Sequence, residues 1–141
     1  MYLDTCYIAK FYFNEAGSSH VRELVRKADA IYSSFWAFAE FHAVIHRRMR
    51  EGALSSRDAR AMASRFSEHL EHGLWNLVPV TEALLRRTSA LIISAPGDLS
   101  IRTADAVHLL TAHEIGERDL WTGDRHMLAA APYFGMTGRS V

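Results

Sequence analysis

The sequence predicts an α/β protein, a three-layer α/β/α sandwich with a mainly parallel sheet of about five strands. Short β-like runs alternate with longer helical runs along the 141 residues, and this alternation builds βαβ units with helices on both faces of a sheet. The composition, 49% hydrophobic and 23% charged, supports a packed core and excludes a disordered or fibrous chain. The length suits one domain, so we expect residues 1–141 to form a single unit.

The expected strands are short and rich in apolar or β-branched residues. The first covers 2–3 and ends in Asp4, and a fifth lies near Val141. The other three are expected at 30–33, 77–80 and 120–122.

Helical segments fill the stretches between these strands, and most begin beside a side chain that can cap a helix. The expected ranges are 5–13, 18–27, 35–50, 56–72, 82–93, 104–115 and 124–131. The candidate caps are Thr5, Ser18 or Ser19, Ser55 or Ser56, Thr81, Thr103 and Asp124. Gly52, Gly73 and Gly116 follow three of the helices, as is typical of helix ends.

The charge balance excludes some classes of partner and leaves others open. Lys plus Arg and Asp plus Glu number 16 each, so the net charge is zero, which argues against tight non-specific binding of nucleic acid. It leaves open a local acidic pocket within a mildly basic remainder. Cys6 is the single cysteine, so no intrachain disulfide or cysteine-based zinc site is possible, and we expect a reducing compartment, the cytoplasm. We expect neither a signal peptide nor a membrane span.

Four carboxylates are predicted near one edge of the sheet. Asp4 ends the first strand, Asp124 follows the fourth, Asp105 lies in the first turn of the helix before that strand, and Glu40 lies early in the helix after the second strand. Sites in parallel sheets form beyond the carboxyl ends of the strands. We therefore expect chemistry at this edge.

Each acid also has a structural explanation. Asp105 and Asp124 suit first turns, where the helix dipole favours an acid, and Asp4 can cap a helix or end a strand. Glu40 is harder to explain in this way, because it lies within the apolar run 35–45 and an unpaired buried carboxylate is costly.

Together, the four acids favour a metal site. Converging carboxylates without a cationic partner repel one another, so their pKa values rise or a cation fills the space. An all-oxygen set suits Mg²⁺ or Mn²⁺, and such an ion can activate water for attack on a phosphodiester.

Four segments contain these acids: Met1-Tyr2-Leu3-Asp4-Thr5, Ala39-Glu40-Phe41, Thr103-Ala104-Asp105-Ala106-Val107-His108-Leu109 and Thr122-Gly123-Asp124. In their order and spacing they resemble the PIN-domain family, specifically the VapC-type toxins of bacterial toxin–antitoxin systems. The resemblance implies a PIN-like fold and a metal-dependent ribonuclease. It also implies a cognate VapB-type antitoxin as partner, RNA as substrate, and a homodimer.

The motif acids of that family correspond to Asp4, Glu40, Asp105 and Asp124, and its hydroxyl positions beside the site to Thr5 and Thr122. Our hypothesis is that the first three acids hold a Mg²⁺ or Mn²⁺ ion, while Asp124 completes that shell or supports a second ion. A metal-bound water would then attack the phosphodiester in line, with Thr5 and Thr122 orienting ligands or water.

An RNA strand also needs positive charge and stacking surfaces near the acids. Arg102 and Arg125 flank motif acids and are the preferred contacts; other candidates are Arg47, Arg48, Arg50, Arg86 and Arg87. Trp36, Tyr12 and Phe13 can stack bases, although the core is the simpler place for each. Apolar surface on the two long helices suits a dimer or an antitoxin.

Other interpretations fit these residues less well. The histidine pairs 42/46 and 69/72 lack the HExxH arrangement of a zinc site, and His108, on the same helical face as Asp105, suits either the core or the site. A haloacid-dehalogenase-type phosphatase needs a second aspartate where Cys6 stands, and a response-regulator receiver needs paired acids and a late lysine. A catalytically silent PIN-like module that binds RNA or protein is the remaining alternative.

Overall fold

The sheet is built from five short strands. The computed structural model describes residues 1–141, with strands β1 (Tyr2–Leu3), β2 (Tyr32–Ser34), β3 (Asn76–Val78), β4 (Asp119–Trp121) and β5 (Thr137–Arg139). Their order in the sheet is β3-β2-β1-β4-β5, and all neighbouring pairs are parallel. In the centre, Tyr2 pairs with Tyr32 on one side and with Leu120 on the other.

Helices connect the strands, as βαβ units require. They are α1 (Thr5–Tyr12), α2 (Ser18–Lys27), α3 (Trp36–Arg50), α4 (Ser56–Glu71), α5 (Glu82–Ile93), α6 (Thr103–Glu114), α7 (Arg125–Ala130) and a 3₁₀ turn, η1 (Ala131–Phe134). None of them combines the length and the apolar character needed to cross a membrane.

Each face of the sheet has its own hydrophobic core. Adjacent side chains of a strand point to opposite faces, and the two residues of β1 divide accordingly. Leu3 belongs to a cluster with α1, α2, α3 and α4, whereas Tyr2 belongs to a cluster with α5, α6, α7 and η1. The α/β/α sandwich with a parallel sheet is thus confirmed.

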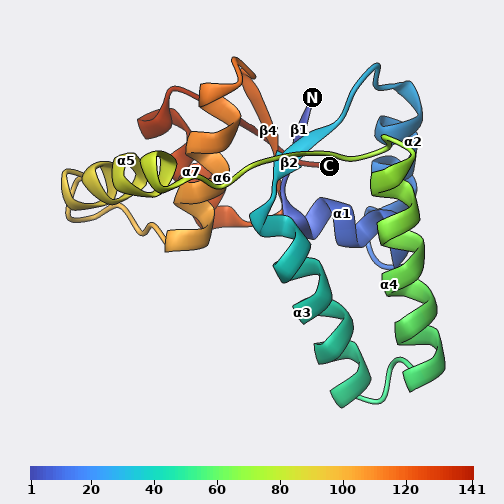
Figure 1. The fold of residues 1–141 in the computed structure, drawn as a ribbon. Helices are drawn as coiled ribbons and strands as arrows, with labels where there is room; N and C mark the ends of the chain where they lie inside the picture. The colour runs from blue at the N-terminus through green and yellow to red at the C-terminus, as the bar shows by residue number, and fades with distance from the viewer.

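The long helices α3 and α4 pack side by side and extend away from the sheet (Figure 1). Phe41 of α3 and Phe66 of α4 are fully buried between them, with ring centroids 4.4 Å apart. Burial of one such side chain contributes about 1.5–3 kcal/mol. This packing turns one face of α3 inward and leaves its other faces for solvent and for the pocket described below.

The helix starts differ in part from the expectations. Ser55, Thr81 and Asp124 cap α4, α5 and α7 as predicted, since each side chain accepts a hydrogen bond from a backbone N–H of the first turn. Asp4, not Thr5, caps α1. The predicted caps of α2 and α6 were wrong: Gly17 with φ 84° precedes α2, Arg102 precedes α6, and neither helix has a side-chain cap.

Four strands lie within two residues of the predicted ranges. The fifth, expected near Val141, covers Thr137–Arg139 and so ends two residues before that position. Tyr32–Ser34 and Asn76–Val78 pair residue by residue. This register decides their ends, and it is invisible in the sequence of either strand alone.

Candidate active site

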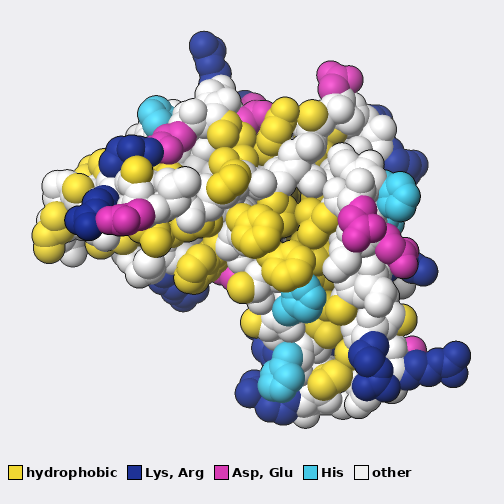
Figure 2. Space-filling view, viewed as in Figure 1, with side chains coloured by type: hydrophobic (Ala, Val, Ile, Leu, Met, Phe, Trp, Pro, Cys, Tyr) yellow, Lys and Arg dark blue, Asp and Glu magenta, His cyan; other side chains and the backbone are white.

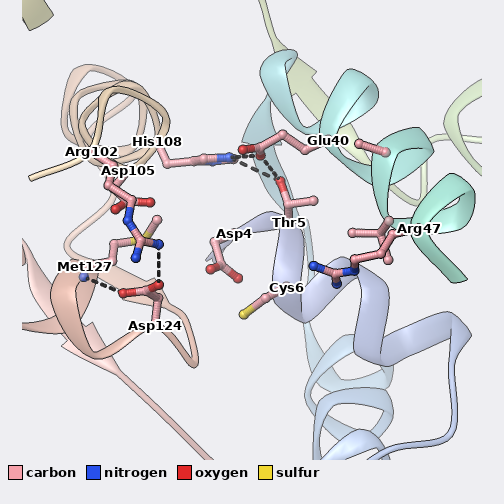
Figure 3. A pocket seen from close by; sticks show the side chains of 12 residues that line it. Asp4, Thr5, Cys6, Glu40, Arg47, Arg102, Asp105, His108, Asp124 and Met127 are labelled. Carbon is pink, nitrogen blue, oxygen red and sulfur yellow. Dashed lines mark hydrogen bonds and ion pairs between the residues drawn. The ribbon is translucent and has the colours of Figure 1, made fainter. Parts of the chain in front are cut away.

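A pocket of about 490 Å³ lies at the carboxyl edge of the sheet. Four segments far apart in the sequence meet there: the β1–α1 junction, α3, the start of α6 and the start of α7 (Figure 3). All four predicted acids line it, as do Thr5, Cys6, Ala43, Val44, Arg47, Arg102, His108 and Met127. The predicted edge of the sheet therefore does bring the four acids to one pocket.

Asp4 is held at the base of the pocket by the end of β1. Its Oδ1 accepts from the backbone N–H of Tyr7 at 3.0 Å, and its Oδ2 accepts from the Thr122 hydroxyl at 2.6 Å. Burial raises the pKa of the Asp4 carboxyl, and the hydrogen bond from Thr122 opposes this rise. Thr122 does not line the pocket but fixes Asp4, consistent with its predicted role of orienting the site.

Asp105 lies in the first turn of α6 and has a buried oxygen, Oδ2, without a hydrogen-bond partner. Burial and the nearby charge of Asp124 raise the pKa of Asp105, while Arg102 and His108 act in the opposite direction. A buried polar atom left unpaired costs about 1–3 kcal/mol. Asp105 Oδ2 is therefore a buried acceptor that no group of the protein satisfies.

Asp124 begins α7, where its Oδ1 accepts from the backbone N–H groups of His126 and Met127 at 2.7 and 3.2 Å. Its Oδ2 lies 3.5 Å from Arg102 Nη1. Arg102, which was predicted to flank a motif acid, is thus a cationic neighbour of Asp124. Arg102 is an exposed partner, so the pair contributes little to stability.

Glu40 points from α3 toward α6, and its charge is well satisfied (Figure 3). Its Oε2 accepts from the Thr5 hydroxyl and from His108 Nε2, the latter at 3.0 Å. Burial opposes the charged form, but the hydrogen bond and charge of His108 and the hydrogen bond from Thr5 outweigh it, so the pKa of Glu40 is lowered. The carboxylate inside an apolar run is therefore explained by a partner 68 residues away.

His108 connects Glu40 to the core of the molecule. The ring is 1% exposed, and its Nδ1 lies 2.9 Å from the Tyr2 hydroxyl. Because the Glu40 carboxylate carries no proton, Nε2 must be the donor, which in the neutral ring leaves Nδ1 to accept from Tyr2. Burial raises the pKa of Tyr2, so its hydroxyl keeps the proton that it donates. His108 is thus a buried residue that also lines the pocket. Its spacing of three from Asp105 in the sequence predicts that the two side chains share one face of the helix.

The remaining predicted residues divide into those at the pocket and those outside it. Arg102 lines the pocket, whereas Arg125 is exposed outside the lining and donates to the ring of His126 at 3.4 Å. Arg47 was one of several basic candidates and also lines the pocket. Tyr12 and Phe13 lie in the core as expected, but Trp36 is 41% exposed, so the expected core position was wrong.

The donor chemistry of the pocket fits a hard divalent cation. Its acids are all oxygen donors, and Asp105 has a buried oxygen without a partner. Burial raises the pKa values of Asp4 and Asp105, and the charge of Asp124 adds to the rise at Asp105. Burial also raises the pKa of the Cys6 thiol, so it supplies no thiolate. No three His, Cys, Asp or Glu side chains are already gathered closely enough to surround one ion.

Comparisons with known proteins agree with this fold. The family model described as PIN domain matches residues 1–132. The crystal structure of VapC20 from Mycobacterium tuberculosis, described as a sarcin-ricin-loop-cleaving toxin, superposes with a TM-score of 0.73 and 17% sequence identity, covering 92% of this chain and 93% of that one. No curated protein sequence matches the chain significantly.

Proposed function

The chain belongs to the PIN-domain family, and from this premise we propose that it is a metal-dependent endoribonuclease, the toxin of a VapBC-type toxin–antitoxin pair. One observation carries the proposal: Asp4, Glu40, Asp105 and Asp124, from four separate segments, line one pocket in which Asp105 Oδ2 is buried without a partner. The fold similarity to a VapC toxin is consistent with this activity.

We propose that Mg²⁺ or Mn²⁺ is held by Asp4, Glu40, Asp105 and Asp124. Such an ion supplies an activated water and offsets the charge that develops on the phosphate. The chain's own groups prepare the site. Thr122 fixes the Asp4 carboxylate, and His108 with Thr5 fixes Glu40. Preorganised groups of this kind cost little reorganisation during the reaction.

Arg102 is proposed to contact the RNA backbone, because its guanidinium stands beside the acids and is largely exposed. Arg125 is proposed to contribute outside the pocket, since it is exposed on the first turn of α7. Contacts to phosphate position a strand without reading its sequence. We also propose that RNA is the substrate, that a VapB-type antitoxin is the partner, that the protein forms a homodimer, and that it acts in the cytoplasm.

The test is to incubate the purified protein with RNA in the presence of Mg²⁺ or Mn²⁺, and again with a chelator. Cleavage that is lost on chelation and in Asp4→Asn supports the proposal. Retained metal-dependent cleavage in Asp4→Asn would overturn the assignment of the site. Absence of cleavage by the wild-type protein, with RNA binding intact, would favour the catalytically silent binding module.

A further inference from the structure

We propose that one face of α3 is a binding edge for single-stranded RNA, in which Trp36 stacks on an unpaired base and Arg47 contacts a backbone phosphate. This inference rests on the proposed ribonuclease function and concerns the path of the RNA strand past the four acids. Glu40 lies between the two residues along the helix, so the edge would hold the strand on both sides of that carboxylate.

The helical repeat places these residues on one face. Glu40, Ala43, Val44 and Arg47 follow each other at helical spacing and all line the pocket. Trp36 precedes Glu40 by four residues and extends this face by one turn. With a rise of about 1.5 Å per residue, Trp36 and Arg47 lie about 16 Å apart along the axis, so the two contacts would fall on different nucleotides of an extended strand.

Trp36 is not a core residue. The buried side of α3 is formed by Ala37, Phe41 and Ile45, whereas the Trp36 side chain is 41% exposed. Figure 2 shows hydrophobic side chains gathered over the region where α3 begins. Trp36 lies one helical turn before Glu40 on the same face of α3, so the indole extends the side of the helix that lines the pocket.

Arg47 and its neighbour Arg48 differ in a way that separates structure from binding. Arg48 pairs with Glu15 and lies over the ring of Phe13, 4.2 Å from the centroid. Arg47 forms no ion pair, is exposed, and reaches toward the pocket opposite Arg102 and Asp124 (Figure 3). Arg102 lies 3.5 Å from Asp124, so Arg47 is the arginine of the pocket that has no carboxylate partner.

An aromatic surface and a free cation on either side of an acid suit a nucleic acid strand better than a protein. Base stacking is tolerant of sequence and contributes about 1–3 kcal/mol per base, while a phosphate contact adds affinity that salt weakens. The two residues should therefore contribute in different ways that one binding experiment can separate.

The experiment measures binding of a fluorescent single-stranded RNA by anisotropy, at several salt concentrations, with Asp4→Asn as the parent so that the RNA stays intact. Trp36→Ala in this parent should weaken binding about 5- to 150-fold with an unchanged salt slope, and Trp36→Phe should retain most of the affinity. Arg47→Ala should lower the salt slope by about 0.7.

Matched controls define the edge. Phe35→Ala removes an aromatic ring that is 53% exposed and adjacent in sequence, but that stacks on Phe38 and lies about 140° around the helix from Glu40. Arg57→Ala removes an exposed charge on α4 that does not line the pocket. Both should bind RNA like the parent. Because the Trp36 and Phe35 side chains are partly buried, thermal midpoints are measured for every variant and binding is compared at a temperature at which all of them are folded.

Unchanged RNA binding in Trp36→Ala and Arg47→Ala, or equal losses in the Phe35 and Arg57 controls, would overturn the inference. So would a Trp36→Ala variant that binds RNA normally but loses a partner protein, because the surface would then be a protein interface. If the wild-type protein cleaves RNA while these variants bind normally, only this inference fails. If the wild type neither binds nor cleaves RNA, both proposals fail.

Discussion

Two walls of the pocket differ in how they hold their carboxylates. On the α3 wall, the Glu40 carboxylate accepts hydrogen bonds from His108 and Thr5, and its pKa is lowered. On the α6 wall, Asp105 has a buried oxygen without a partner, and its pKa is raised. The α3 wall is therefore satisfied, because the protein's own groups hydrogen-bond its carboxylate, whereas the α6 wall is unsatisfied. The unsatisfied wall shows where an external cation would gain most, and the satisfied wall shows which acid the fold holds in place beforehand.

The largest expected effect comes from neutralising the unsatisfied wall. Asp105→Asn should lower kcat for RNA cleavage about 1,000-fold or more, because several kcal/mol of charge stabilisation by a bound ion would be lost. The measurement is single-turnover cleavage with Mn²⁺ or Mg²⁺ at saturation. Activity within tenfold of wild type would show that Asp105 is an ordinary first-turn acid.

A divalent cation should stabilise the metal-free protein, since binding to the folded state alone at 100 times the dissociation constant adds about 2.7 kcal/mol. Thermal unfolding should shift upward with Mg²⁺ or Mn²⁺, and the shift should be nearly absent in Asp105→Asn. Na⁺ at equal ionic strength is the control for simple screening. An equal shift with Na⁺ would remove the case for a specific ion.

Breaking the satisfied wall should have a smaller effect on catalysis. His108→Leu removes the donor to Glu40, and loss of such a supporting partner typically costs about 10- to 100-fold in activity. The expected change is in kcat with little change in KM, because Glu40 would lose its orientation without loss of an RNA contact. His108→Gln keeps an N–H at similar reach and should restore most of the rate.

A packing control separates orientation from stability for this variant. Thr88→Val also changes a buried polar side chain. Thr88 lies in α5, its hydroxyl donates only to the Leu84 carbonyl, and it does not line the pocket. Its kcat should stay at the wild-type value. Equal losses in His108→Leu, His108→Gln and Thr88→Val would mean that His108 acts only through packing.

The same contrast explains what the sequence could predict. The positions of Asp4 and Asp124 follow from strand ends, and those of Asp105 and Glu40 from helices beside them, so backbone topology alone brings the four acids to one pocket. The caps of α4, α5 and α7 could also be predicted from the sequence, because an N-cap hydrogen bond spans only two or three residues.

Contacts between segments far apart in the chain could not be predicted from the sequence. The bond from His108 to Glu40 joins residues 68 apart, and helical spacing fixed only that His108 shares a face with Asp105. Likewise, Arg47 and Arg48 are equivalent in sequence, and only the packing of α3 decides that one enters the pocket while the other pairs with Glu15. The exposure of Trp36 depends on the same rotation of the helix.

The smallest expected effect is the most direct test of the contrast, because it has opposite signs on the two walls. In metal-free protein, the raised pKa of Asp105 means that its contribution to stability is present below the unfolded value of about 3.8 and is lost as pH rises through the folded pKa. Asp105→Asn should therefore unfold a few degrees above wild type at neutral pH, with the difference vanishing near pH 3.

Glu40→Gln should behave in the reverse way. The lowered pKa of Glu40 means that its contribution is present above the unfolded value of about 4.3 and is lost as pH falls through the folded pKa. This variant should unfold below wild type at neutral pH and approach it in acid. Thermal unfolding of the two variants and wild type from pH 3 to 7, with chelator present, measures both signs. If both variants shift in the same direction at neutral pH, the two walls hold their carboxylates alike, and the orphaned oxygen of Asp105 no longer points to a cation.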